Sequence, residues 1–470
     1  MDFESLSRDS YAILAAMSYL DPDNIPEALF EPETPESLPQ ALKFCSVPAV
    51  FTQAIEALVA LSLVKRDKDT RSLSLHRLVQ TSLKRSMTLE QKQAAFNDAA
   101  ALVAKAFPRR DTEVATLYLM WDRCATYLKH VISLKNCFRE EHKPLHGIFV
   151  APPIYCDLNN MCQRYLLELH SYSELEDLIE VNMMAMETLP KEEADGLRAS
   201  LTSHKGQSLV FIGKPEEGTK WLEESYEIRR CADPFNPRES AWAASNVAMG
   251  YATLNRFEEA IKWHEETRIH FMSWAKKQTD RKWKLPADTT CYRGLAYFWA
   301  GQTETARETI CEAQKLAEEE EPFSWAVSAL VHFSLGNIER YDRNYEAAEA
   351  HYMKAQNLWL EGGKMRSDPF SASCMYRLGC TALDRGTVEA AIKHLRDALV
   401  VTEMRKANMV AEHARVLFKL SKALEQNPRN KEEARRKRDE AEHLLNLPDP
   451  NADNPGEDSI YDSLVCIEWR

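Results

Sequence analysis

The chain has 470 residues, of which 44% are hydrophobic and 28% are charged, and its formal net charge is −13. Only 14 glycines occur, so Gly-rich phosphate loops and turn-rich β architecture are disfavoured and a mostly helical protein is expected. The acidic balance also disfavours nucleic-acid binding, which requires clustered Lys and Arg.

Signals for export, membrane insertion and metal binding are not expected. Residues Met1–Glu4 lack the basic region and apolar run of a signal peptide, and the longest apolar stretches are too short or too interrupted to span a bilayer. The 11 cysteines are scattered without a C-x-x-C pair, which predicts reduced thiols. We expect a cytoplasmic protein, with a nuclear location as the alternative, and neither a membrane nor a metal partner.

Residues 1–87 are predicted to form a small module of helices and one hairpin. Ser62–Lys65 and Ser72–Leu75 are short enough to pair as strands around a polar turn. Helical spacing is predicted for Tyr11–Leu20, Val47–Leu61 and His76–Met87, and a short turn of helix for Ile25–Phe30. Helices followed by a small hairpin are typical of a winged helix. The helix before the hairpin carries no Arg or Lys to read base edges, so DNA binding is not expected.

Residues 88–156 are interpreted as a helical connector, with a long helix at Leu89–Phe107 followed by the stretch Trp121–Leu128. Residues 446–470 are interpreted as a polar linker followed by an apolar segment, Ser459–Arg470. We expect that segment to pack on the last repeat as a cap.

A repeated pattern of small and aromatic residues covers residues 157–445. Its mid-repeat positions are separated by 43, 42, 46, 42, 43 and 43 residues, and they are Leu175, Gly218, Ala260, Ala306, Ala348, Ala391 and Ala434. The pattern predicts about seven antiparallel helix pairs, in which small residues allow close approach and aromatic residues fill the space beside them. One pair cannot bury its apolar face alone, so the pairs are expected to stack into a right-handed superhelical array.

The pattern resembles the tetratricopeptide repeat (TPR), in the longer version known from kinesin light chains and fungal NLR-like receptors. The predicted fold class is therefore all-α, a TPR-like α-solenoid preceded by a small winged-helix module. In kinesin-light-chain-type repeats, Asn residues line the concave face, and here Asn246 alone keeps that pattern. By aligning the copies, we predict a partner-binding groove that includes His204, Gln207, Asn246, Met249, Tyr292, Asn337, Arg340 and Arg377.

The N-terminal module is similar to the winged-helix part of fungal NLR-like proteins. The similar stretches are LSRDSYAILAAMSYLDPDNIPEALF, LVALSLVKR and LSLHRLVQTSLKR. The resemblance implies a preceding NB-ARC nucleotide-binding domain, and it places His76 at the histidine of the family's Met-His-Asp motif, with Arg77 where many members carry Asp. No G-x-x-x-x-G-K-[ST] loop occurs in the chain. We therefore expect no nucleotide switch here and interpret His76 as a packed or capping histidine.

No catalytic motif occurs: H-E-x-x-H, G-x-S-x-G and G-x-G-x-x-G are all absent from the sequence. We expect no enzyme activity, no catalytic residues and no cofactor. The leading hypothesis is a scaffold or adaptor that binds a protein or peptide in the concave groove. The alternatives are a nucleotide-controlled NLR-type signalling component that needs an NB-ARC partner in trans, and an accessory scaffold of a metabolic, possibly secondary-metabolite, pathway.

Overall fold

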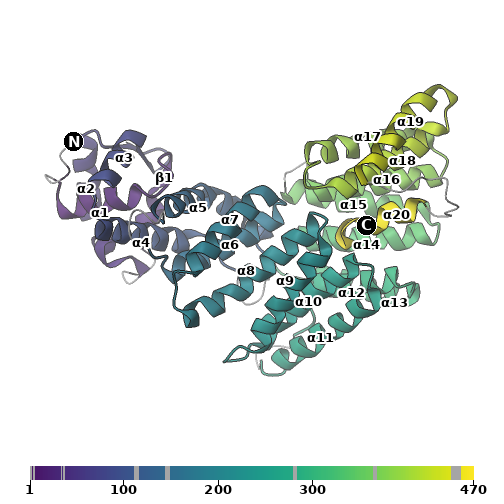
Figure 1. Cartoon of the computed structure of the whole chain (residues 1–470), viewed down its shortest axis with the longest axis horizontal. Helices are drawn as coiled ribbons and strands as arrows, with labels where there is room; N and C mark the ends of the chain where they lie inside the picture. The colour runs from purple at the N-terminus through teal and green to yellow at the C-terminus, as the bar shows by residue number, and fades with distance from the viewer. Residues whose placement is uncertain are drawn as a thin grey trace. The chain divides into compact units, whose positions relative to one another are not determined.

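A computed structural model describes residues 3, 6–32, 34, 37–110, 116–142, 149–278, 283–363, 368–445 and 457–470. The chain divides into two compact units, Met1–His204 and Lys205–Arg470, which are described separately. The division falls inside one helix, at none of the predicted domain boundaries. Figure 1 shows that helices dominate both units.

The first unit begins with the predicted helices and hairpin. The helices are α1 (Arg8–Met17), α2 (Pro48–Ala60) and α3 (Arg77–Ser86), with a 3₁₀ segment η3 (Gln40–Ser46) before α2. The hairpin strands are β2 (Val64–Asp67) and β3 (Ser72–Leu75). Asp67 closes the turn between them, because its Oδ1 accepts hydrogen bonds from the backbone N–H groups of Asp69 and Thr70 at 2.9 and 3.2 Å.

One prediction for this module was wrong. Residues Ile25–Pro26 form a strand, β1, rather than a turn of helix, and only Glu27–Phe30 form a 3₁₀ turn, η1. Strand β1 pairs with β3 and completes an antiparallel sheet with the order β1-β3-β2. Pro26 lacks an N–H donor, which an edge strand tolerates, and the fully buried Ile25 anchors that edge.

The predicted connector helices are present as α4 (Leu89–Ala106) and α5 (Trp121–Glu141), which a 3₁₀ turn η4 (Tyr118–Met120) precedes. Thr88 and Gln91 form a capping box that begins α4. Phe96 of α4 contacts the rings of Phe138 and Tyr155, at centroid distances of 6.0 and 5.1 Å, and those two rings also contact each other at 5.5 Å. This aromatic cluster joins the connector to the first helix pair.

Seven helix pairs follow within the described residues, which confirms the predicted repeat. The pairs are α6 (Pro153–Glu168) with α7 (Tyr172–Met186), α8 (Lys191–Phe211) with α9 (Pro215–Arg230), α10 (Pro237–Thr253) with α11 (Phe257–Ala275), α12 (Ala287–Trp299) with α13 (Thr303–Glu319), α14 (Trp325–Tyr341) with α15 (Tyr345–Gly363), α16 (Pro369–Asp384) with α17 (Val388–Met404), and α18 (Val410–Glu425) with α19 (Lys431–Leu445). A short 3₁₀ turn, η6 (Pro428–Asn430), precedes α19. Every predicted mid-repeat position lies on the second helix of its pair and is buried.

The turns inside the first six pairs share one geometry. Each contains a residue with positive φ: His170, Gly213, Asn255, Gly301, Arg343 or Gly386. The next residue donates its N–H to the carbonyl five positions earlier, as in the bonds Lys214 to Leu209 (2.8 Å) and Arg256 to Tyr251 (2.9 Å). This is the Schellman ending of a helix, which satisfies carbonyls that the last turn would otherwise leave unpaired. The turn therefore adds a constant number of residues to each of these six repeats.

Gly206 of α8 and Gly218 of α9 set the closest approach between two helices. A Cβ atom on Gly206 would lie 2.8 Å from the carbonyl oxygen of Gly218, and a Cβ on Gly218 would lie 2.7 Å from that of Gly206. The two backbones therefore touch, which confirms the predicted role of small residues in the pairs.

In the part of the chain that the structure describes, no single helix is long and apolar enough to cross a membrane. Segments η3 and α2 would meet those criteria only jointly, and they are bent by 109° relative to each other.

Candidate functional site

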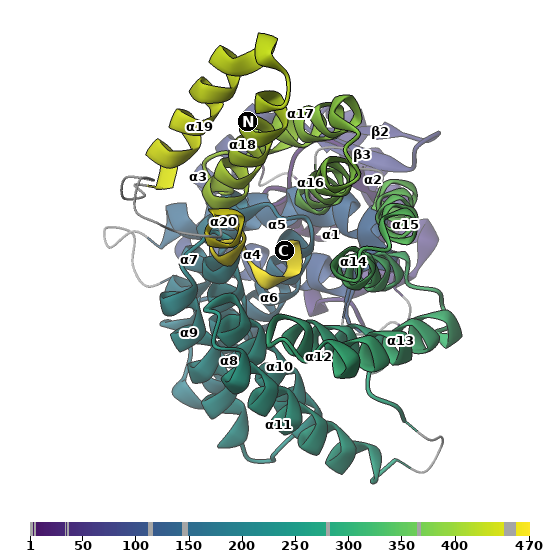
Figure 2. The ribbon, with the colours of Figure 1, turned by 90° about the vertical axis from the view of Figure 1, so that its right-hand side faces the viewer.

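The second unit encloses its own C-terminal segment. Residues 457–470, which we call the tail, comprise a short helix α20 (Glu457–Ser463) and a 3₁₀ turn η7 (Ile467–Trp469). Helix α20 packs on α18, and η7 contacts α10 and α16. Figure 2 shows the tail among the first helices of the pairs, with α12, α14, α16 and α18 around it.

This course differs from the expected cap. The tail does pack on α18, the first helix of the last pair, but it then continues to α10, which lies four pairs earlier in the chain. The reason is that its apolar residues, among them Val465, Ile467 and Trp469, are buried along the inside of the unit rather than over the end of the last pair. The expected linker lies mostly in residues 446–456, outside the described residues.

The unit's residues that contact the tail form the site, and we call them the inner surface. They come from turns and first helices, and they include Phe211, Thr253, Asn255, Asn337, Phe370, Arg377, Arg415, Phe418, Lys419 and Lys422. Most are buried, so the contacts with the tail are made in a largely water-free setting.

Acidic tail residues meet cations of the inner surface. Asp462 Oδ1 accepts a hydrogen bond from Arg415 Nη1 at 3.1 Å, and its Oδ2 lies 3.6 Å from Arg377 Nη1. Burial opposes ionisation of Asp462, but the two guanidinium groups outweigh it and hold the pKa of this carboxyl below its usual value. One helical turn earlier, Asp458 accepts from Lys419 Nζ at 2.7 Å.

Aromatic contacts flank these ion pairs. The ring of Tyr461 stacks on Phe418 with a centroid distance of 4.2 Å and an angle of 13°. The centroid of the Trp469 ring lies 6.2 Å from that of Phe370 and 6.0 Å from that of Phe211. Both tail residues are buried, so each removes a large aromatic surface from water.

The last residue is held by neutral atoms. The guanidinium of Arg470 donates to the carbonyls of Val465, Ser463 and Thr253 and to Asn255 Oδ1, at distances between 2.6 and 2.8 Å. Asn337 Nδ2 in turn donates to the Arg470 carbonyl at 3.0 Å. Burial lowers the pKa of Arg470 to about 10.

The predicted groove residues divide into two groups. Asn337 and Arg377 belong to the inner surface and contact the tail. Arg340 instead pairs with Asp384, on the first helix of the next pair, at 2.7 Å. His204, in the first unit, is buried and its Nδ1 lies 3.1 Å from Gln163 Oε1. Of the others, Gln207 and Met249 are buried, and Asn246 and Tyr292 are half-buried.

The sequence reasoning missed Arg415 and Lys419. Both lie on α18, in the last copy of the repeat, where no groove residue was assigned. A signal was present: two cations one helical turn apart interrupt the otherwise apolar stretch Ala414–Leu420. Long cationic side chains in an apolar stretch indicate a buried acidic partner.

His76 has the capping role that was predicted. It is exposed at the N-terminus of α3, where its Nδ1 accepts a hydrogen bond from the backbone N–H of Leu78 at 3.2 Å. All 11 cysteines are free, as expected, and Cys231 is the one classed as exposed.

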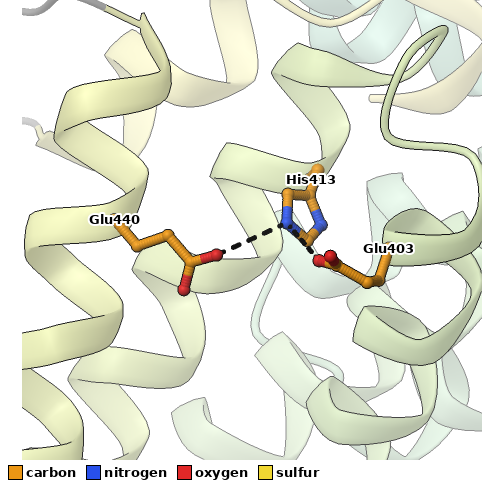
Figure 3. Close-up of side chains that lie close together, drawn as sticks. All are labelled: Glu403, His413 and Glu440. Carbon is orange, nitrogen blue, oxygen red and sulfur yellow. Dashed lines mark ion pairs between the residues drawn. The ribbon is translucent and has the colours of Figure 1, made fainter.

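One cluster has side chains suited to a metal ion. Glu403 of α17, His413 of α18 and Glu440 of α19 converge so that one ligand atom of each lies within 4.8 Å of the others. Figure 3 shows both carboxylates directed at the imidazole, whose Nε2 lies 2.9 Å from Glu403 and 4.0 Å from Glu440. Burial lowers the pKa of His413, against the pull of the two carboxylates.

The ammonium groups of two lysines already form ion pairs with these carboxylates. Lys406 Nζ lies 3.8 Å from Glu440 and 4.0 Å from Glu403, and Lys437 Nζ lies 3.1 Å from Glu440. A divalent cation would have to compete with both. We therefore interpret the cluster as an ion-pair network that joins α17, α18 and α19.

Glu412 of α18 should make stability depend on pH. Burial raises the pKa of this carboxyl to about 7, from an unperturbed 4.5. The folded chain thus keeps a proton that the unfolded chain loses between these values, and stability falls as pH rises through that window. Replacing Glu412 by Gln should stabilise the protein by up to about 3 kcal/mol at pH 8 and by little at pH 4.5.

Urea unfolding at the two pH values measures this effect, with the exposed Glu432→Gln on α19 as the control. A Glu412→Gln change of the same size at both pH values would contradict the assignment.

Comparison with known proteins gives a family match for the N-terminal module alone. Residues 1–92 match the model of a family described as Domain of unknown function (DUF7779). No curated protein matches the chain.

Several solved structures are similar in fold. The complex of NprR with its cognate peptide NprX has a TM-score of 0.48 and 14% identity, with 73% of this chain and 96% of that chain covered. The Rap conjugation gene regulator of plasmid pLS20, in complex with the Phr* peptide, has a TM-score of 0.49 and 12% identity, with 76% and 90% covered. A STAND ATPase with a tetratricopeptide repeat sensor from Pyrococcus horikoshii has a TM-score of 0.44 and 14% identity, with 95% and 65% covered. At these scores the similarity carries no information on the ligand of this chain.

Proposed function

We propose that this chain is a non-catalytic scaffold or adaptor that binds a peptide segment of a partner protein on the inner surface of its helix pairs. The observation that supports this most directly is that the surface binds a peptide segment of the chain itself. Arg415 donates to a side chain and to a main-chain carbonyl of the tail, and Asn337 donates to another carbonyl. Contacts of both kinds are what peptide recognition requires.

The proposed site extends beyond the tail contacts along the first helices. We retain Asn246 of α10 and Tyr292 of α12 as partner-binding residues, because both are half-buried on first helices of the same unit. Gln207 and Met249 are buried, and we assign them packing roles beside that surface; His204 is buried within the first unit, and we assign it a packing role there. We place the protein in the cytoplasm, and we propose that its N-terminal module is a winged helix that serves as a second docking face.

Selection of peptides tests the proposal. A phage-displayed library of random 15-residue peptides is selected on the full chain, and the affinity of enriched peptides is measured by fluorescence anisotropy. We expect Asn246→Ala and Tyr292→Ala to weaken binding at least fivefold, because side-chain contacts are worth about 1 kcal/mol or more each. Val400→Ala, on the exposed side of α17, serves as the control.

Peptides that bind equally well to all variants, or no enrichment at all, would contradict a peptide site on this surface. Calorimetric titration with ATP or ADP separates the nucleotide-controlled alternative. The proposed scaffold binds neither nucleotide, whereas binding lost in His76→Ala would favour the alternative.

A further inference from the structure

The tail supplies the carboxylates that the inner surface lacks. Among the described residues, the ion pairs of Arg377, Arg415 and Lys419 all lead to Asp458 or Asp462 of the tail. The side chains of the three cations are 7% exposed or less. Without the tail, the inner surface would present these three cations and no acidic partner for them, which is a strong electrostatic preference for an acidic ligand.

The tail also has the form of a bound peptide. It joins the helix pairs through residues 446–456, and its contacts reach back more than 200 positions in sequence, as in the hydrogen bond from Asn255 Nδ2 to the Ser463 carbonyl at 3.1 Å. The inner surface contacts three kinds of group in the tail. They are two carboxylates one helical turn apart, a tyrosine beside them that stacks on Phe418, and a buried tryptophan.

One contact of the tail carries a free-energy cost that partly offsets the others. Arg470 is buried among carbonyls and one amide oxygen, with no carboxylate within ion-pair distance among the described residues. Moving a guanidinium out of water without an opposite charge offsets much of the benefit of its hydrogen bonds. A ligand with the same acidic and aromatic groups but without this arginine would avoid that cost.

We propose that residues 457–470 are an intramolecular pseudo-ligand that occupies the partner site, and that the partner supplies an acidic segment with the same groups. Such a segment carries two carboxylates four positions apart, an aromatic residue beside the second, and a tryptophan after them. The inference rests on the proposed function and adds its regulation: binding of the partner requires displacement of the tail.

Because the tail is covalently linked to the helix pairs, it should strongly reduce the apparent affinity of the inner surface for a free peptide. A segment held by a short linker competes at an effective concentration in the millimolar range. A free peptide at micromolar concentration therefore competes with it at a disadvantage of about 1,000-fold. Weakening the tail from within the same chain should remove that disadvantage without altering the inner surface.

The experiment uses the full chain and a labelled synthetic peptide of residues 457–470. Asp462→Asn in the chain leaves Arg377 and Arg415 intact but removes their shared carboxylate from the tethered tail. We expect this variant to bind the wild-type peptide at least tenfold more tightly than the wild-type chain does, as measured by fluorescence anisotropy. Asp439→Asn, an exposed aspartate of α19, makes the same chemical change away from the site and should behave as wild type.

Peptide variants define the ligand chemistry. With the Asp462→Asn chain, a peptide that carries Asp462→Asn should bind at least tenfold more weakly than the wild-type peptide. A peptide that carries Leu464→Ala should bind within twofold, since Leu464 is 44% exposed. Equal binding by all three peptides would overturn the proposed acidic recognition.

A second experiment avoids Asp462→Asn, in case this substitution destabilises the unit. A protease site replaces part of residues 446–456 in the full chain, and cleavage leaves the tail bound without its tether. Exchange of the cut tail for labelled peptide supports the proposal. Aggregation on release of the tail, or failure to exchange, would make the tail a permanent part of the core and overturn it.

Three further outcomes are distinguishable. Equal peptide binding by the wild-type chain and by Asp462→Asn would refute the block while leaving the proposed function intact. Exchange of the tail for labelled peptide, combined with a failure of every foreign peptide to bind, would support displacement of the tail but refute the proposed function. A wild-type dimer in sedimentation, dissociated by the peptide, would assign the tail to a second copy and overturn the intramolecular arrangement.

Discussion

Replacing Arg415 by Met is expected to lower the free energy of unfolding of the second unit by about 3 kcal/mol. The Arg415 side chain is 1% exposed, and it donates to Asp462 and, at 2.8 Å, to the Trp469 carbonyl. Its guanidinium carbon also lies 4.1 Å from the centre of the Tyr376 ring. Met fills a similar volume but leaves Asp462 with Arg377 alone, at 3.6 Å, so a buried carboxylate loses its better partner.

A double-mutant cycle isolates the ion pair. If the loss arises from the poorly paired carboxylate, Asp462→Asn should cost less in the Arg415→Met chain than in the wild-type chain, because Asp462 has then already lost its closer partner. Arg396→Met is the control: it breaks an exposed pair with Glu433 and should cost less than about 1 kcal/mol. Urea unfolding measures the four chains of the cycle and the control. Additive losses from Arg415 and Asp462 would show that the two residues act independently.

Replacing Gly218 by Ala is expected to destabilise the protein by about 2–3 kcal/mol, although alanine is the better helix former. The new Cβ would lie 2.7 Å from the Gly206 carbonyl oxygen and 2.9 Å from the Val210 backbone nitrogen. Backbone atoms cannot rotate away as a side chain can, so α8 and α9 would have to move apart.

Gly196 provides the matched control, because it lies on α8 with no heavy atom within 4 Å of an added Cβ. Gly196→Ala should therefore stabilise the protein by about 0.5–1 kcal/mol. The two identical substitutions should change the urea midpoint in opposite directions. A higher urea midpoint in both variants would mean that α8 and α9 can move apart at little cost, and that the glycine contact does not set their spacing.

The helix pairs were predictable because their causes are local. Small residues such as Gly206 and Ala260 recur where two backbones must approach, and the turn between them has one geometry and nearly one length. Strand β1 was missed because two residues, Ile25 and Pro26, carry too little pattern to reveal a strand, and pairing with β3 decides their conformation.

The candidate site was only partly predictable. Asn337 and Arg377 were found because they lie in clear copies of the repeat, where register alone indicates the inward face. Arg415 and Lys419 belong to the last copy, and their role depends on Asp458 and Asp462, which come from the tail. Arg340 was placed correctly on a first helix, but its partner Asp384 lies on the neighbouring one.

By itself, the sequence determined the repeating helix pairs and their period, because both depend on residues close together along the chain. Only the tertiary structure decided where the tail lies, since Thr253, Asn337 and Arg415 meet it from three separate pairs. Such a meeting depends on how the pairs stack, and no local pattern of residues encodes which distant segment will fill the space that stacking creates.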